Sequence, residues 1–438
     1  MNQRDHQILQ IALPSIVSNI TVPLLGMIDV AIVGHMGSPV YMGAVAVGSM
    51  IFNLVYWLFG FLRMGSSGLT AQALGRKDLT EVTRILVRSV SVALGIALLL
   101  IILQAPLKWL MFWLIGPTAD VAPFASAYFN IVIWGAPASL TLFSLMGWYI
   151  GMQNTRIPMV ISIMQNIVNI LASLTLVYGL GMKIEGVALG TVIAQYAGLL
   201  MAIGLLVRYY SRIFRFFRRD RIFKKMGAFF AVNRDIFLRT LCLVAVNLFF
   251  TSAGARQGAV ILSVNTVLIQ LYLFFSYFMD GFAYAGEALG GKAYGAHNGI
   301  AFRETLRRLW MWMLIVTSAY TLLYIGGGQW IVSLLTDEAQ VLETSREYLW
   351  WAWLIPAAGC VAFIWDGIFI GITATRGMLV SSFLSALAFF AVYLLTESAL
   401  GNHGLWLAQI VYLSMRGIIQ TIWFRFRLSS LHAMEMTK

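Results

Sequence analysis

The sequence predicts an all-α membrane protein with twelve transmembrane helices in two pseudo-symmetric six-helix bundles. Three observations support this prediction: apolar runs recur along the whole chain, basic residues gather in alternate loops, and the second half repeats motifs of the first. The chain has 438 residues, of which 60% are hydrophobic and 11% are charged, whereas a soluble domain carries about 25% charged residues. A mean hydropathy of +0.81 fits a protein that is solvated by lipid.

Each apolar run is long enough to cross a bilayer, because one spanning helix needs about 20 apolar residues. The first run is too long for the hydrophobic region of a cleavable signal peptide, so it is interpreted as a spanning helix. The predicted helices cover residues 7–34, 40–66, 82–104, 122–150, 157–181, 185–209, 229–253, 258–288, 303–326, 341–371, 377–399 and 404–426.

The distribution of Lys and Arg predicts the orientation of the chain, because cytoplasmic loops carry an excess of basic residues. If the basic link over 210–228 is cytoplasmic, six spans precede it and both termini are cytoplasmic. All but four of the 30 basic residues then lie at or near the inner side, the exceptions being Lys108, Lys183, Arg256 and Arg346. The net charge of +12 is thus a topology signal for a bacterial inner-membrane protein, and no nucleic-acid partner is expected.

The two halves of the chain are related by a shift of 220 residues. Gly147-Trp-Tyr-Ile-Gly151 corresponds to Gly367-Ile-Phe-Ile-Gly371, and Ala71-Gln-Ala-Leu-Gly75 corresponds to Gly291-Lys-Ala-Tyr-Gly295. Motifs that recur on the same membrane side after six spans indicate a parallel repeat. Two such bundles around a cleft have the geometry of alternating access.

The repeat also predicts the domain boundaries. We expect a first lobe over residues 1–209, a basic cytoplasmic linker over 210–228 and a second lobe over 229–438. The lipid bilayer is the surroundings that this organisation requires, and no obligate protein partner is expected.

Three acidic residues lie inside predicted spans: Asp29, Asp280 and Asp366. An ionisable group at bilayer depth costs at least about 2.5–3.5 kcal/mol and marks a functional site by default. Arg63 and Arg239 lie near the inner ends of their predicted helices and can extend to the interface, so no basic residue is expected at the midplane. An anionic or neutral cavity favours a cationic cargo. Asp280 and Asp366 are a candidate cation site, with a structural network as an equal alternative.

Asp29 is the strongest of the three signals. Pro23 lies six residues before it, and Gly26 lies between them. Proline removes the helical hydrogen bond to the carbonyl of Asn19 and creates a kink point. We therefore expect Asp29 to be a proton-coupling acid beside a hinge at Pro23 and Gly26. The alternative is a carboxylate at the end of the helix, in the outer headgroup region.

A second polar stripe follows two neighbouring spans. Asn166, Asn169 and Ser173 share one face of the predicted helix over 157–181, while Thr191 and Gln195 are one turn apart on the next span. These side chains can hydrogen-bond Asp29 or a substrate. Hydrogen bonding between helices is the alternative role.

Other chemistry finds no support in the sequence. Cys242 and Cys360 lie in apolar runs, where neither a metal site nor a secretory disulfide framework is expected. We find no P-loop, zinc motif, nucleophile elbow or Rossmann turn. Neither an enzyme nor an ATP-driven pump is expected, and no cofactor beyond a coupling ion.

Several segments together resemble the multidrug and toxic compound extrusion (MATE) family, and most of all its DinF-like branch. The resemblance covers nearly the whole chain and implies a V-shaped pair of six-helix lobes. It also implies secondary active export of organic cations or amphipathic compounds in exchange for protons or sodium. The segments are Leu13-Pro14, Asn19–Pro23 with Asp29, Gly34-His35, Gly68–Gly75, Asp280–Ala285 with Glu287, and Asp366–Gly371.

The resemblance assigns protonation to Asp29, and polar-network or hinge positions to Pro14, Asn169 and Thr191. Two positions depart from the family pattern: Leu25 stands where relatives often have tyrosine, and Ser173 stands where they often have aspartate. With one acid instead of two, a sodium site loses a charged ligand. Protons are therefore favoured over sodium as the coupling ion.

Two other functions, a flippase and a receptor or channel, fit the sequence less well. A lipid-linked oligosaccharide flippase of the same broad superfamily would need Arg or Lys inside its cavity to hold a pyrophosphate, and the sequence places acids there. A receptor or channel would explain neither the repeat nor Asp29 beside a hinge. Proton-coupled drug antiport is the leading hypothesis, and sodium-coupled antiport is its nearest alternative.

Overall fold

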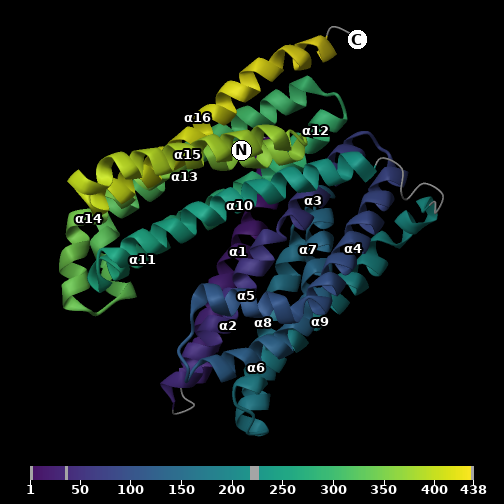
Figure 1. Cartoon of the computed structure of the whole chain (residues 1–438). Coiled ribbons are helices and arrows are strands. Elements are labelled where there is room, and N and C mark those ends of the chain that lie inside the picture. The colour runs from purple at the N-terminus through teal and green to yellow at the C-terminus, as the bar shows by residue number, and fades with distance from the viewer. Residues whose placement is uncertain (1–2, 35–37, 218–225, 436–438) are drawn as a thin grey trace. The chain divides into compact units, whose positions relative to one another are not determined.

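The computed structural model describes residues 3–34, 38–217 and 226–435 (Figure 1). Every regular element in these ranges is helical. Eleven helical segments in them are long and apolar enough to cross a membrane. In addition, α1 (Gln3–Gly34) is 32 residues long. The predicted all-α membrane class is therefore confirmed.

The contacts divide the chain into two compact units. We call Val17–Met226 the N-unit, and Met1–Ile16 together with Gly227–Lys438 the C-unit. The predicted basic linker over 210–228 lies partly outside the described residues, and its described part includes the short helix Ser211–Phe216.

The N-unit contains the second half of α1 and the helices that follow it. A π-helical turn, Thr175–Gly179, extends α8, and a short helix, Ile133–Gly135, joins α6 to α7. The helices are α2 (Pro39–Leu58), α3 (Phe61–Gly75), α4 (Leu79–Ile102), α5 (Gln104–Ile115), α6 (Ala122–Val132), α7 (Ala136–Gly151), α8 (Arg156–Leu174) and α9 (Ile184–Tyr210).

The C-unit contains longer helices, and α15 and α16 lie side by side along most of their length (Figure 1). A π-helical turn, Gly286–Gly290, joins α11 to α12. The helices are α10 (Met226–Arg256), α11 (Ala259–Ala285), α12 (Gly291–Gly295), α13 (Gly299–Leu335), α14 (Ala339–Gly371), α15 (Thr375–Leu400) and α16 (Asn402–Glu435).

Two details differ from the helices expected from the sequence. The helix expected over 40–66 is interrupted between α2 and α3, and α5 forms where a loop was expected. With 12 residues, α5 is too short to be found as a span. Its Trp109 and Trp113 are 68% and 71% exposed. Exposed tryptophans of this kind are enriched at membrane–water interfaces.

The internal repeat is present in the backbone packing as well as in the sequence. A Cβ atom on Gly147 would overlap the carbonyl oxygen of Arg63 in α3, and a Cβ on Gly367 would overlap that of Ala283 in α11. The partners Arg63 and Ala283 are themselves 220 residues apart. Glycine thus permits the same close helix approach in both units.

The repeat extends to the turns. Lys77 has a φ of 58° and His297 a φ of 53°, a left-handed conformation that non-glycine residues rarely adopt. After each turn a side-chain oxygen caps the next helix: Asp78 Oδ1 accepts a bond of 2.9 Å from the backbone N–H of Glu81. Asn298 Oδ1 makes the equivalent bond with the N–H of Ala301, also at 2.9 Å.

The start of α1 packs with the C-unit. Arg4 pairs with Glu304 of α13 at 3.2 Å. Asp5 pairs with Arg308 at 3.5 Å and accepts a bond of 3.3 Å from the indole N–H of Trp312. These polar contacts explain why α1 up to Ile16 belongs to a different unit from the rest of the helix.

Candidate functional site

Asp29 lies in the second half of α1, within the N-unit. Its side chain is buried, with the residue only 8% exposed. The oxygen Oδ1 has no hydrogen-bond partner among the described residues. An ionisable side chain that is buried in a spanning helix marks a candidate functional site.

Three hydrogen bonds from α8 and its π-helical extension hold α1 on both sides of Asp29. Ser18 Oγ lies 2.8 Å from Ser162 Oγ, and the amide of Asn166 donates a bond of 2.9 Å to the backbone carbonyl of Thr21. Beyond Asp29, the hydroxyl of Tyr178 donates to the carbonyl of Ile32 at 3.2 Å. Asp29 therefore lies in a segment of α1 that hydrogen bonds hold in place on both sides.

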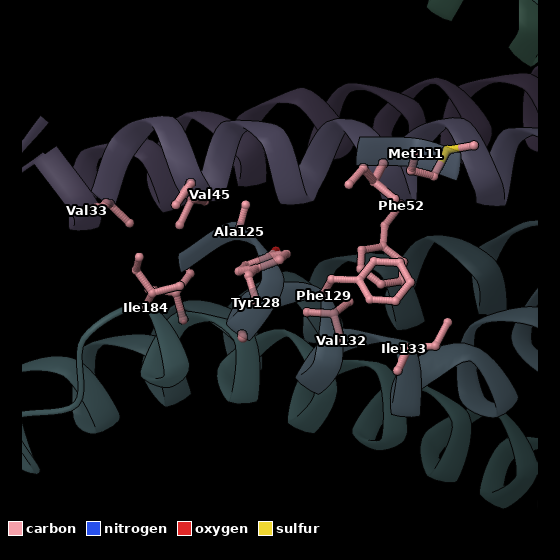
Figure 2. Close-up of a cluster of buried hydrophobic side chains, with 14 of the residues drawn as sticks. Val33, Val45, Phe52, Met111, Ala125, Tyr128, Phe129, Val132, Ile133 and Ile184 are labelled. Carbon is pink, nitrogen blue, oxygen red and sulfur yellow. The ribbon is translucent and has the colours of Figure 1, made fainter. Parts of the chain in front are cut away.

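Tyr128 of α6 is the aromatic neighbour of this acid, close enough for an electrostatic interaction with Asp29 and close to Thr191. Its hydroxyl lies 3.5 Å from that of Ser49. Figure 2 shows Tyr128 and Phe129 within an apolar cluster that also includes Val45 of α2. This cluster keeps water away from the polar groups beside it.

The polar stripe of α8 meets α9 as the sequence predicts. The amide of Asn169 donates a bond of 3.3 Å to Thr191 Oγ1. Ser173 packs directly against Gly190, where a Cβ atom would overlap its hydroxyl. Both Asn169 and Ser173 are buried. The contacts between helices expected as one alternative are therefore present.

Buried oxygen atoms in this region nevertheless lack partners. In the described part of the chain, neither Asn169 Oδ1, Ser173 Oγ nor Gln195 Oε1 makes a hydrogen bond. The side chain of Gln195 packs against Gly135, where a Cβ would collide with Oε1. An unpaired buried acceptor costs about 1–3 kcal/mol. Asn169 and Ser173 of α8 and Gln195 of α9 thus each keep a buried oxygen that accepts no hydrogen bond from the described residues.

The remaining predicted positions of the first half fall in different places. Pro23 lies inside α1, between the Asn166 bond and Asp29. Gly26 lies in the same helix, and its surroundings are outside the described part. Pro14 lies in the part of α1 that belongs to the C-unit.

In the C-unit, Asp366 occupies an ion-pair cluster that the sequence did not predict. Arg239 of α10 and Arg416 of α16 both donate from Nη2 to Asp366 Oδ2, the second of them at 2.5 Å. The amide of Gln420 donates to Asp366 Oδ1 at 2.6 Å. Two guanidinium groups already satisfy this carboxylate, so the structure favours the network alternative for Asp366 over an open cation site.

Two expectations about basic residues are corrected by this cluster. Arg239 does not extend to the interface, because it is 5% exposed and paired with Asp366. Arg416 is 4% exposed, in the middle of a helix where no basic residue was expected. Arg416 and Gln420 lie one turn apart on α16, which was the available signal.

Asp280 lies on α11 and is half-buried. Tyr272 lies eight residues before Asp280 on the same helix. It is close enough for electrostatic interactions with both Asp280 and Asp366. The two acids thus share an aromatic neighbour. Within the described residues, no three His, Cys, Asp or Glu side chains lie close enough together to hold a metal ion.

Comparison with known proteins places this arrangement in a family. The MatE family model matches residues 14–175 and 236–394. The DNA damage-inducible protein F of Escherichia coli (strain K12) is 40% identical over 97% of this chain and 93% of its own length. A probable multidrug resistance protein NorM of Acinetobacter baylyi is 23% identical over 94% of each chain.

The solved structures give the same answer for the fold. An outward-facing multidrug resistance MATE family transporter of the MOP superfamily matches with a TM-score of 0.87 at 18% identity, over 98% of this chain and 97% of that chain. The family model matches both halves of the repeat, and the structural match runs through both units. The chain is therefore a multi-pass membrane protein that belongs to the MATE family of multidrug efflux transporters.

Proposed function

We propose that this chain exports organic cations or amphipathic compounds in exchange for protons, and that Asp29 carries the proton. The observation that supports this most directly is the buried carboxylate of Asp29, whose Oδ1 lacks a hydrogen-bond partner in the described part of the molecule. When ionised, it offers a negative charge to a cation. When protonated, it loses that attraction and the cation is released.

The surrounding acceptors extend the proposal to the cargo. Asn169, Ser173 and Gln195 present oxygen atoms that lack partners among the described residues. Such atoms gain more from a ligand with N–H donors and a positive charge than from an apolar one. Ser173 is a neutral residue at the position where relatives often carry an acid, which supports a proton over a sodium ion.

The orientation follows from the positions of the basic residues. We propose that the protein lies in a bacterial inner membrane with both termini in the cytoplasm, because cytoplasmic loops are enriched in Lys and Arg. Asp29 lies 21 residues after Ile8, where the first apolar run begins, and is therefore near the outer end of α1. It can therefore receive a proton from outside before the transporter changes the side to which it opens.

The proposal is tested by dye transport in proteoliposomes under an imposed pH gradient. Asp29→Asn should abolish proton-driven export, because an amide has the shape of the carboxyl group but cannot release a proton. Asp120→Asn is the matched control, since Asp120 is exposed in the turn before α6. Full proton-driven export by Asp29→Asn would overturn the proposal. Export by the parent that follows a sodium gradient alone would favour sodium coupling.

A second candidate is transport of an acidic amphipathic compound. Lipid-linked phosphate substrates would need basic side chains inside a bundle, and Arg239 and Arg416 are both buried in the C-unit. That candidate depends on whether these arginines bind an anion.

A further inference from the structure

We propose that Arg239, Arg416 and Tyr412 form a buried binding site in the C-unit for an oxyanion, a carboxylate or phosphate group carried by an amphipathic molecule. The site goes beyond the proposed proton exchange at Asp29 and does not depend on it. It rests on the charge of the cluster, its unused donors and its absence from the repeat-related half.

The first observation is an imbalance of charge. Arg239, Arg416 and Asp366 are each more than nine-tenths buried, so two positive groups face one negative group. A buried charge without a counter-charge is unfavourable. Asp280, the other acid near Tyr272, is half-buried, so it is not one of these enclosed groups. An anionic ligand would supply the charge that the buried groups lack.

The second observation is that donors remain after Asp366 is satisfied. Asp366 accepts three bonds, from Arg239, Arg416 and Gln420. Among the described residues, the Nε–H groups of both arginines have no acceptor. In a guanidinium group, Nε and Nη2 point the same way and form a fork that fits a carboxylate or phosphate. Each arginine here uses only one side of that fork.

Tyr412 adds a third donor to the same place. Its ring lies 5.7 Å from the guanidinium of Arg416, and its buried hydroxyl has no partner in the described part of the chain. Gln420 Oε1 is the acceptor of the cluster that also lacks a partner. Three unpaired donor groups against one unpaired acceptor favour an acceptor-rich ligand over a cation.

The third observation comes from the internal repeat. The positions 220 residues before Arg239, Asp366, Arg416 and Gln420 are uncharged in the N-unit. The same backbone packing therefore forms without this cluster, so the scaffold itself does not require it. The corresponding residues are Asn19, Met146, Tyr196 and Leu200.

The test measures binding of dodecyl phosphate to the purified full-length protein in a neutral detergent. Dodecyl phosphate should raise the melting temperature and bind saturably in calorimetry, while dodecyltrimethylammonium, with the same tail, should not compete with it. Arg416→Lys keeps the charge but loses the fork, and Tyr412→Phe keeps the ring but loses the hydroxyl. We expect about tenfold and about threefold weaker binding, respectively. Ser414→Ala, on the same helix, is the matched control.

Two arms distinguish the sources of the oxyanion. If the group belongs to a lipid, nanodiscs of phosphatidylglycerol should block dodecyl phosphate binding and nanodiscs of phosphatidylcholine should not. If it belongs to a solute, binding should be equal in both. Arg416→Gln combined with Asp366→Asn lowers the positive and the negative charge together, so this variant should fold without binding. Equal affinity for dodecyl phosphate in the parent, Arg416→Lys and Tyr412→Phe, or no binding by the parent, would overturn the proposal.

Discussion

The amide of Asn166 donates a hydrogen bond of 2.9 Å to the backbone carbonyl of Thr21, two residues before Pro23. Pro23 cannot donate the helical hydrogen bond to the carbonyl of Asn19, so the bond from Asn166 helps to hold α1 where its own hydrogen bonding is interrupted. This bond joins α8, which carries Asn169 and Ser173, to the helix that carries Asp29. The two helices are therefore tied together next to Pro23.

Asn166→Ala should weaken this coupling. The lost bond is worth about 0.5–1.5 kcal/mol, and it leaves the carbonyl of Thr21 with one donor fewer. We expect proton-driven dye export to fall several-fold while the protein still folds. Transport in proteoliposomes together with the melting temperature checks this. Asn130→Ala is the control, since Asn130 is exposed and its side-chain oxygen accepts a bond of 3.0 Å from Lys108. Equal losses in both variants would argue against a specific role for Asn166.

Pro23→Ala should stiffen α1. Alanine restores the N–H that proline lacks, and the intrinsic preference for helix rises by about 3 kcal/mol. We expect slower turnover with the cation affinity retained, because the acceptor groups stay in place while the helix resists bending. Equilibrium binding of a fluorescent cation and its transport rate separate these two effects. A normal transport rate would show that bending at Pro23 is not needed.

Export of a monovalent cation should be insensitive to membrane potential if Asp29 is the one coupling site. Moving one charge outward against 100 mV costs about 2.3 kcal/mol, and an entering proton returns the same amount. The exchange is then electroneutral and depends on the pH difference alone. Proteoliposomes with a fixed pH difference, and a potential clamped by potassium and valinomycin, provide the measurement. A strong voltage dependence would point to a second charged site.

The close helix approaches of the repeat give a prediction about stability. Gly147→Ala and Gly367→Ala should each destabilise the protein by about 1–3 kcal/mol, because the new methyl group overlaps a backbone carbonyl. Gly95→Ala and Gly326→Ala are the controls, since a Cβ atom at either position meets open space. Alanine in a helix should be neutral or mildly stabilising there. Melting curves in detergent that show no difference between the two pairs would contradict this packing.

The sequence predicts the helices of this protein well and their pairing less well. Apolar runs locate the spans because lipid requires them, and the repeat at Gly147 and Gly367 identifies the halves. The short helix α5 is not predicted, because it does not have to cross the membrane and so lacks a long apolar run. The unit to which Pro14 belongs is not predicted either, because the chain order gives no sign that α1 begins in one unit and ends in the other.

The candidate site shows the same limit. Asp29 and Asn166 stand out because polar residues are costly in an apolar span. Tyr128 does not, since it belongs to an aromatic-rich segment that resembles any other core. The pairing of Asp366 with Arg239 depends on the rotation of helices 127 residues apart in the chain. A single sequence indicates which side of each helix faces the protein interior, but not which helix packs against that side.

The two halves share the same backbone packing but carry different charged residues, and this difference limits what a dimer of either half alone could do. Two copies of the first half, docked as a dimer, would reproduce the glycine contacts and contain two copies of Asp29 but no arginine pair. Two copies of the second half would contain two arginine pairs and no counterpart of Asp29, whose repeat-related position is Phe249. Each symmetric dimer would keep the glycine contacts of its half, and neither would contain both Asp29 and the arginine pair.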